Sequence, residues 1–448
     1  ALAGLVAHHW ERAGEILEAA RWTRRAAEWA EMRNLGEALR HWRKLRDLVA
    51  LVPESPESMA LALAARVNII ARGVWHGDPE NQSATLFAEG RELAIRLGET
   101  RRLALLESAY SGALSSSGDV QAAIEHSLEG LRLAELCGDD SIKLAIRVTL
   151  VYAYEIAGRI EDALALTQDV LRHPPDDPKL GAGAGFSPYV FFAYFAANLL
   201  TQLGRLGEAR AQLERALELA RELDEPDLQS LAHGFFCYLA RCFGDPEIAR
   251  SHAADAVRIA EALGSALSRT FAYRGLGISH LMSDEWQPAA SALENALRIA
   301  RESRTVLWVE PYVLADLAEA YIALGRVAEG RQTIARALEL ARRSRSKNAI
   351  CHAQLAQARL LLRTEGAPAA ADVAAALEDA RQMEQPSYAP QIHLARAKLA
   401  ALEGDAPRQQ HELREAARTA AAIGALGYGR IVAVELDALE AARDKRPA

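Results

Sequence analysis

Few residues of this chain have the types and spacing that catalysis requires. None of its six lysines follows a glycine, so there is no GxxxxGK[ST] loop to hold nucleotide phosphates. His411-Glu412 lacks the second histidine that a zinc protease helix places one turn after the first. Gly185 and Ser187 begin a nucleophile-elbow pattern, but neither a closing glycine nor a preceding strand completes it. We therefore expect this chain not to be an enzyme.

Residues that could bind a metal are also poorly arranged. The cysteines show neither CxxC nor zinc spacing, and they are Cys137, Cys237, Cys242 and Cys351. Free cysteines commonly pack as small apolar residues, so we expect buried thiols and a cytoplasmic location. We expect the neighbouring His8 and His9 to be structural residues and not metal ligands. The sequence predicts neither a metal nor a cofactor.

Charge and hydropathy exclude two further classes. The formal net charge is −8, and the 52 basic residues are scattered, which argues against a nucleic-acid surface. A single basic cluster comprises Arg342, Arg343, Arg345 and Lys347. At a helix end such cations complement the helix dipole, and phosphate binding is the alternative. Because no apolar stretch reaches about 20 residues, no membrane partner is expected.

A short turn recurs about every forty residues and reveals the elements that position all these side chains. The turns are Gly77-Asp78, Gly118-Asp119, Gly158-Arg159, Gly204-Arg205, Gly244-Asp245, Gly325-Arg326 and Gly404-Asp405, with Ser283-Asp284 and Gly366 in the two gaps. A fixed period of this length is typical of a solenoid, in which each unit buries its apolar face against its neighbours.

Small residues mark where the helices of each repeat should cross. One series follows each turn, and it consists of Ala123, Ala163, Ala209, Ala249, Ala289 and Gly330. A second series lies seven residues further on, at Gly130, Ala216, Ala256, Ala296 and Ala337, with Val170 in the Gly158 repeat. Seven residues is nearly two helical turns, so both series face the same way and permit close helix approach.

This pattern resembles the tetratricopeptide repeat over most of the chain. The clearest copies are 190–223, 228–263, 267–302 and 312–345. The resemblance implies an all-α fold, a right-handed α-solenoid of about ten helix pairs. The lengthened repeats are similar to the C-terminal superhelices of large bacterial signalling ATPases. We expect repeats over 53–424 and a capping helix and tail over 425–448.

The first 52 residues depart from the repeat and contain most of the tryptophans. Their distinctive runs are Ala7-His8-His9-Trp10-Glu11-Arg12-Ala13-Gly14-Glu15, Ala19-Ala20-Arg21-Trp22, Arg25-Ala26-Ala27-Glu28-Trp29-Ala30 and Glu37-Ala38-Leu39-Arg40-His41-Trp42. This segment resembles the one that follows the ATPase module in class III adenylate/guanylate cyclases with a tetratricopeptide tail, and in LuxR-type ATPase regulators. The resemblance implies a junction, 1–52, after an upstream module. Most of its tryptophans are expected in the core.

A second departure is the Pro- and Gly-rich segment 174–188, which cannot be helical and must be a loop between repeats. It is followed by the aromatic run that begins at Tyr189. The loop could be a tolerated surface insertion or a mobile lid beside an aromatic binding surface.

The tetratricopeptide resemblance also implies a binding groove. In that family the first helix of each pair lines the concave face, at positions about six, ten and thirteen residues before the turn. Here these positions hold Tyr152, Phe191, Tyr194, Asn198, Tyr238, Phe271, Arg274, Tyr312 and Glu319. They are aromatic and polar, which suits a peptide, a protein partner or a mid-sized effector.

The sequence as a whole predicts a non-catalytic regulatory superhelix. It would bind an effector or partner in the groove and pass its occupancy to upstream modules of the same polypeptide through a conformational shift. A constitutive scaffold for oligomerisation or docking is the alternative.

Overall fold

The computed structural model describes residues 2–31, 35–76, 82–117, 119–181, 187–303 and 306–444. Within these ranges every regular element is a helix, so the all-α prediction is confirmed. No helix of the described ranges is both long and apolar enough to cross a membrane.

The chain divides into two compact units. The main segment of unit 1 ends at Phe192 and unit 2 begins at Ala193, so this boundary lies inside helix α10 (Pro188–Gln202); Ser303 also belongs to unit 1. In the described part of the chain, ten consecutive helix pairs run from α2–α3 to α20–α21, with α1 before them and α22 after them. This agrees with the predicted number of pairs.

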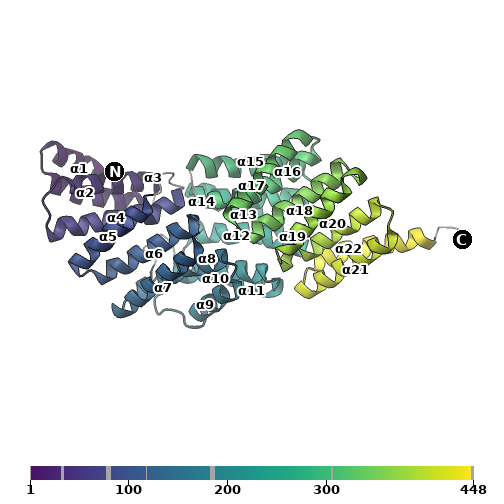
Figure 1. The fold of residues 1–448 in the computed structure, drawn as a ribbon, viewed down its shortest axis with the longest axis horizontal. Helices are drawn as coiled ribbons and strands as arrows, with labels where there is room; N and C mark the ends of the chain where they lie inside the picture. The colour runs from purple at the N-terminus through teal and green to yellow at the C-terminus, as the bar shows by residue number, and fades with distance from the viewer. Residues whose placement is uncertain are drawn as a thin grey trace. The chain divides into compact units, whose positions relative to one another are not determined.

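The helices of unit 1 are α1 (Leu2–Arg12), α2 (Ile16–Glu31), α3 (Leu35–Val49), α4 (Pro56–His76), α5 (Ser83–Leu97), α6 (Thr100–Ser117), α7 (Val120–Leu136), α8 (Asp140–Ile156) and α9 (Ile160–Arg172). The first helices of the pairs, α2, α4, α6 and α8, each contact the next, while α3, α5 and α7 pack between them. Figure 1 shows this row of helices in purple to blue.

The helices of unit 2 after α10 are α11 (Leu206–Glu222), α12 (Pro226–Phe243), α13 (Pro246–Leu263), α14 (Ala266–Met282), α15 (Trp286–Ser303), α16 (Glu310–Ala323), α17 (Val327–Ser344), α18 (Lys347–Thr364), α19 (Ala370–Gln382), α20 (Ala389–Leu402), α21 (Ala406–Ile423) and α22 (Leu426–Asp444). Short 3-10 turns precede three of them: η2 (Leu307–Val309), η3 (Ala367–Ala369) and η4 (Pro386–Tyr388).

The inner helices of unit 2 form a closed series. Helices α12, α14, α16, α18, α20 and α22 each contact the next, and α22 also contacts α12. Figure 1 shows α14 to α20 as neighbouring green ribbons. Because the series returns to its first member, these six helices form a ring. We call the side of the helices that faces the centre of this ring the inner surface.

The recurring glycines end helices as predicted. Those within the described residues adopt left-handed φ angles between 71° and 78°, and they are Gly158, Gly204, Gly244, Gly325 and Gly404. Such angles favour glycine because it has no Cβ. Asp284 (φ 57°) and Gly366 (φ 63°) take the same conformation in the two gaps. Gly77 and Gly118 lie outside the described residues.

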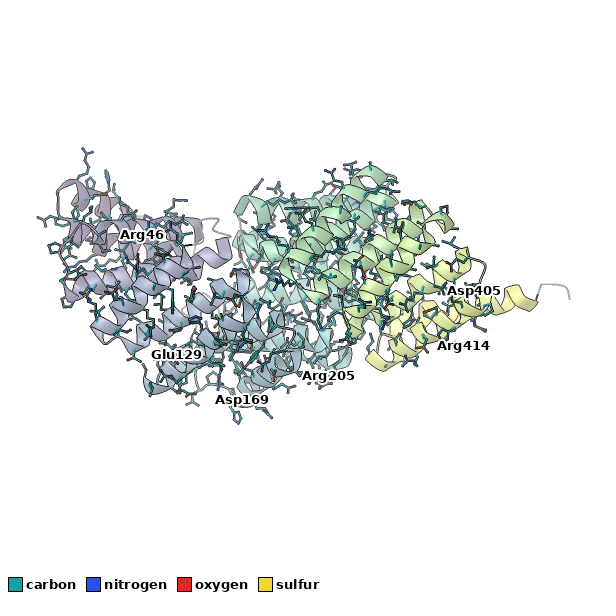
Figure 2. The ribbon with its side chains drawn as sticks, viewed as in Figure 1. Arg46, Glu129, Asp169, Arg205, Asp405 and Arg414 are labelled. Atoms are coloured by element: carbon teal, nitrogen blue, oxygen red, sulfur yellow. The ribbon has the colours of Figure 1, made fainter. Side chains whose placement is uncertain are left out.

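The residue after each turn glycine begins the next helix. Asp245 and Asp405 are N-caps, and the Asp405 carboxylate accepts a hydrogen bond of 3.0 Å from the backbone N–H of Arg408. Where arginine follows the glycine, it pairs with an acidic residue three positions later, as Arg205 does with Glu208 at 2.6 Å. Figure 2 labels Arg205 and Asp405 at these helix starts.

The small residues are buried, as predicted. The alanines of both series are at most 1% exposed. A Cβ on Gly330 would lie 2.7 Å from the Ile322 side chain, and one on Gly130 would lie 3.2 Å from the Ala104 carbonyl. These positions therefore fix how closely successive helices approach.

Two predictions about single residues are wrong. Cys137 is exposed because it follows the last residue of α7, although Cys237, Cys242 and Cys351 are buried. Of the N-terminal tryptophans only Trp42 is in the core; Trp10 and Trp29 are exposed because they lie on the outward sides of α1 and α2. Trp22 is half-buried, and the side chain of Trp75 lies outside the described residues.

Enlarging a crossing alanine should destabilise the stack. Ala209→Leu is expected to lower the free energy of unfolding by about 1–3 kcal/mol, because Ala209 has no exposed surface and the added carbons must displace neighbouring helices. Ala211→Leu in the same helix is the matched control, since Ala211 is exposed. Urea unfolding followed by circular dichroism measures both. Equal stability of the two variants would contradict the packing assignment.

Candidate binding site

The nine predicted groove residues fall in both units. Tyr152 and Phe191 belong to unit 1, and the other seven belong to unit 2. Phe191 and Tyr238 are buried, at 5% and 6% exposure, and the remaining seven are half-buried. These two aromatic side chains are therefore not open to solvent, as direct lining of a groove would require. Neighbouring first helices cover both rings.

In unit 1 the two residues do meet. The rings of Tyr152, on α8, and Phe191, on α10, have centroids 5.7 Å apart. The described part of the 174–188 loop is held nearby: the Ser187 hydroxyl donates to the Pro178 carbonyl at 2.5 Å. Residues 182–186 of this loop lie outside the described residues.

In unit 2 four predicted residues form one continuous cluster. Tyr194 contacts Phe235 edge-on at 5.7 Å, and Phe235 lies 5.4 Å from Tyr238. The Arg274 guanidinium then lies between two rings, 5.7 Å from the centroid of Tyr238 and 5.0 Å from that of Tyr312. Cation–π attraction of this kind favours a fixed guanidinium.

The other predicted residues of unit 2 lie around this cluster. Glu319 forms a 3.5 Å ion pair with Arg359, which also donates to the side chain of Gln391 at 2.8 Å. Phe271 pairs with the exposed Trp308 at 5.7 Å. Asn198 is half-buried on α10. The sequence thus predicted part of an inner surface that six helices build.

The charged centre of this surface was not predicted. Asp316, on α16, has no exposed surface, and its Oδ1 accepts hydrogen bonds from Arg241 on α12 and, at 2.7 Å, from Nε2 of His352 on α18. Its Oδ2 lies 3.8 Å from Nε of Arg274, which is too long for a hydrogen bond. Neither of these two atoms has a hydrogen-bond partner among the described residues.

Burial and charge together fix the protonation of this centre. Burial alone would raise the pKa of Asp316, but the Arg241 charge, aided by His352 and Arg274, lowers it below its ordinary value. Burial lowers the pKa of His352 despite the neighbouring carboxylate, so this imidazole is neutral at pH 7. Burial also raises the pKa of Tyr238. Asp316 is therefore an anion in a dry, positively charged setting.

One signal in the sequence pointed to the missed residues. Asp316 interrupts the apolar run Val313-Leu314-Ala315 and Leu317-Ala318, all of which are buried. An acid in such a run must be paired when it is buried. Arg241 and His352 lie on other repeats, at positions outside the six–ten–thirteen pattern, so only the tertiary structure identifies them as its partners.

The arrangement suits binding rather than bond making. The guanidinium groups of Arg241, Arg274 and Arg359 outnumber the carboxylates of Asp316 and Glu319, which leaves one excess positive charge beside tyrosine rings. No group of His, Cys, Asp or Glu in the described residues is arranged to hold a metal ion. An anionic group flanked by an apolar or aromatic one complements this surface.

Comparisons with known proteins agree with the repeat class. A family model described as a tetratricopeptide repeat matches residues 192–223, which correspond to α10 and α11. The helix pair α10–α11 therefore matches a tetratricopeptide repeat. No curated protein matches the chain.

Several solved structures are similar in fold. A Rap protein complexed with competence and sporulation factor is 12% identical, with 92% of this chain and 99% of that chain covered and a TM-score of 0.46. The apo form of RapI is 10% identical, covering 95% and 99%, with a TM-score of 0.42. The signal transduction ATPase PH0952 from Pyrococcus horikoshii, which has a tetratricopeptide repeat sensor, is 14% identical, covering 88% of this chain and 56% of that one, with a TM-score of 0.43. At these values the similarity does not extend to function.

Removing the central carboxylate should be costly. Asp316→Ala leaves Arg241 buried without its partner and is expected to lower the free energy of unfolding by about 3–5 kcal/mol. The double variant Arg241→Met/Asp316→Leu should recover much of this loss, because neither charge then remains buried. Urea unfolding tests both.

Asp255→Ala is the control for that measurement. Asp255 pairs with Arg258 on the outside of α13, where both side chains are well exposed. Its loss should cost less than about 1 kcal/mol. A similar loss for Asp255→Ala and Asp316→Ala would show that the central pair is not desolvated as described.

Mild acid should destabilise unit 2 through its buried histidines. Burial, and then the neighbouring His252, lower the pKa of His233 from 6.5 to about 4; the two Nδ1 atoms are 2.8 Å apart, so a second proton is disfavoured. The unfolded chain binds protons that the folded chain excludes. The stability is therefore full above about pH 6.5 and is lost as the pH falls towards about 4, by an amount on the order of 2 kcal/mol.

Unfolding by urea at a series of pH values from 7.5 to about 4.5 measures this loss. The variant His233→Asn should show a shallower pH dependence. His173→Asn should not, because that side chain is 76% exposed. Asp316 does not contribute in this window, since its lowered pKa keeps it ionised throughout. Parallel slopes for wild type and His233→Asn would refute the assignment.

Proposed function

We propose that this chain is a non-catalytic regulatory module that binds an effector or a protein partner at the inner surface of unit 2. The module would be the sensor tail of a larger bacterial signalling ATPase or nucleotide cyclase. The observation that carries the proposal is the buried Asp316–Arg241–His352 centre with Arg274 beside it.

This centre is not needed to build a helical stack. Replacing a buried ion pair by apolar residues is often neutral or stabilising, so such a pair is weak evidence of a role in stability. Elsewhere in the described residues two more acids are buried, Glu107 and Glu412, and each pairs with a histidine; unlike Asp316, both keep a small exposed fraction. Charged groups retained at an inner surface where apolar ones would suffice favour a role in recognition.

The chemistry of the surface indicates the kind of ligand. Arg274 is held by Tyr238 and Tyr312, and its Nε has no hydrogen-bond partner among the described residues. A planar guanidinium suits a carboxylate, and tyrosine rings suit an aromatic or apolar side chain. A peptide or partner segment with an acidic group next to an apolar one meets both requirements.

The N-terminal part of the chain supports the attachment to another module. Leu2, Leu5, Trp10 and Trp29 are exposed on α1 and α2. Large apolar side chains on a surface favour contact with another protein or domain. The resemblance of residues 1–52 to the segment after the ATPase module of class III cyclases and LuxR-type regulators agrees with such a junction.

A constitutive scaffold is the second candidate, and the same exposed residues favour it. The two candidates differ in one measurable property. A sensor must bind its ligand more tightly in one of two conformations, so that saturation changes the conformation of the unit. A scaffold binds its partner without such a change.

Selection of peptides tests the proposal. A random library of about 12-residue peptides is selected against the immobilised chain, and enriched peptides are measured by calorimetry. We expect acidic peptides with an aromatic or apolar neighbour to be enriched. Arg274→Gln should weaken their binding about tenfold or more through the loss of a charge-assisted hydrogen bond. Hydrogen exchange with and without saturating peptide then distinguishes sensor from scaffold.

Arg258→Gln is the matched control, since Arg258 is exposed on α13 of the same unit. It should bind the selected peptides like wild type. Failure to enrich any peptide, or equal weakening by the two substitutions, would count against an inner binding surface.

A further inference from the structure

The closed series of inner helices in unit 2 depends on one small contact between residues far apart in the sequence. Gly427, in the first turn of α22, lies against the end of α12; a Cβ there would overlap the carbonyl oxygen of Gly244. In return, a Cβ on Gly244 would lie 2.9 Å from the backbone N of Tyr428. We call this approach of Gly427 and Tyr428 to Gly244 the closing contact.

A second close approach of two helices lies one repeat earlier in the chain, at the turn glycine Gly204. A Cβ on Gly204, which follows α10, would lie 2.7 Å from the side chain of Ile423 and 2.9 Å from that of Pro386. Gly204 and Gly244 both have left-handed φ angles, so helix termination alone explains them. Gly427 has no such requirement, because it is inside a helix. Its lack of a side chain is explained by the closing contact.

An exposed ion pair accompanies the closing contact. Arg430 and Asp245 form an ion pair beside it, with 3.9 Å between the charged atoms and the arginine 67% exposed, and such pairs contribute little to stability. On its other side α22 exposes Leu426, Ile431 and Val434. Val432, by contrast, packs into a cluster with α20 and α21, which ties α22 to its own neighbours. A movement of these C-terminal helices would therefore break the closing contact first.

The closing contact covers the site. Cys242 and Tyr238 lie on α12 directly before Gly244, and both are buried. Burial raises the pKa of Tyr428 to about 12 although the Arg359 charge opposes the shift, and the Cys242 thiol adds to it. While α22 contacts α12, the inner helices enclose Arg274 and the Asp316 centre.

We propose that the closing contact is the gate of unit 2: α22 separates from α12 to admit a ligand to the inner surface and returns when the surface is empty. The role of this opening in ligand access rests on the proposed function, whereas the opening itself does not. Opening would expose the tyrosines and Arg274 without unfolding any repeat. The series of first helices from α12 to α20 would remain intact.

The thiol of Cys242 reports the opening without any ligand. Burial raises its pKa to about 12, so it should react slowly with a disulfide reagent while the contact is closed. The parent protein carries Cys137→Ser to remove the exposed thiol. Labelling of each remaining cysteine is followed by peptide mass spectrometry over time.

Gly427→Ala should accelerate the labelling of Cys242 about tenfold or more, because its methyl group overlaps the Gly244 carbonyl and holds the contact open. Gly429→Ala is the matched control. It lies in the same helical turn, gains the same helix propensity, and its Cβ meets nothing within 4 Å. Cys237 and Cys351 should react equally slowly in all three proteins, since helices away from the contact bury them.

A charge-reversed variant covers the case in which Gly427→Ala unfolds and all three thiols react together. Arg430→Glu places two carboxylates at the contact through an exposed residue. It should accelerate the labelling of Cys242 severalfold, and more so at low salt. Arg414→Glu, an exposed residue of α21 labelled in Figure 2, is its control.

Equal labelling of Cys242 in Gly427→Ala and Gly429→Ala, or in Arg430→Glu and Arg414→Glu, would overturn the gate. This outcome is independent of peptide selection. Accelerated labelling without any selected peptide would leave the gate standing and remove the proposed function. Peptide binding without accelerated labelling would support the proposed function and overturn the gate.

Discussion

Close approach of helices at small side chains is the constraint on which the rest of this structure depends. Alanine at positions such as Ala209, Ala249 and Ala289 leaves no exposed surface at the crossings. Because each crossing is tight, successive repeats of unit 2 follow one another closely, and α22 reaches α12 after the four intervening inner helices α14, α16, α18 and α20. Larger residues at the crossings would separate the helices and prevent that return.

The tight series has an electrostatic consequence. The inner surface would be exposed to solvent in an open stack, but the closed series buries it. Each buried polar group on it therefore needs a partner from another repeat. Arg241 and His352 supply those partners to Asp316 from helices 75 and 36 residues away in the sequence. Packing and charge are thus coupled: the arrangement that buries the alanines also desolvates the carboxylate.

The same coupling gives the unit a reason to have two states. A buried charge centre is stable only while its partners stay in place, and a ligand with its own charge can replace some of them when the series opens. Glycine at residues 244 and 427 allows a backbone contact with few interlocking side chains. Such a contact can form and break at low cost, whereas the alanine crossings cannot. Stability and response therefore reside in different parts of the unit.

The sequence by itself determined the helical class, the repeat period and the turns, because these depend on local chemistry. A glycine with left-handed φ followed by aspartate ends one helix and caps the next wherever it occurs, as at Gly244-Asp245 and Gly404-Asp405. The phase of the repeat also brought Tyr194, Tyr238, Arg274 and Tyr312 onto one surface, as their contacts show. Only the tertiary structure decided that this surface is enclosed, that Tyr238 is buried, and that Asp316 is its charged centre. Those features arise because α22 returns to α12. That return depends on the small shift between each repeat and the next, added over the whole unit, and no short sequence motif encodes it.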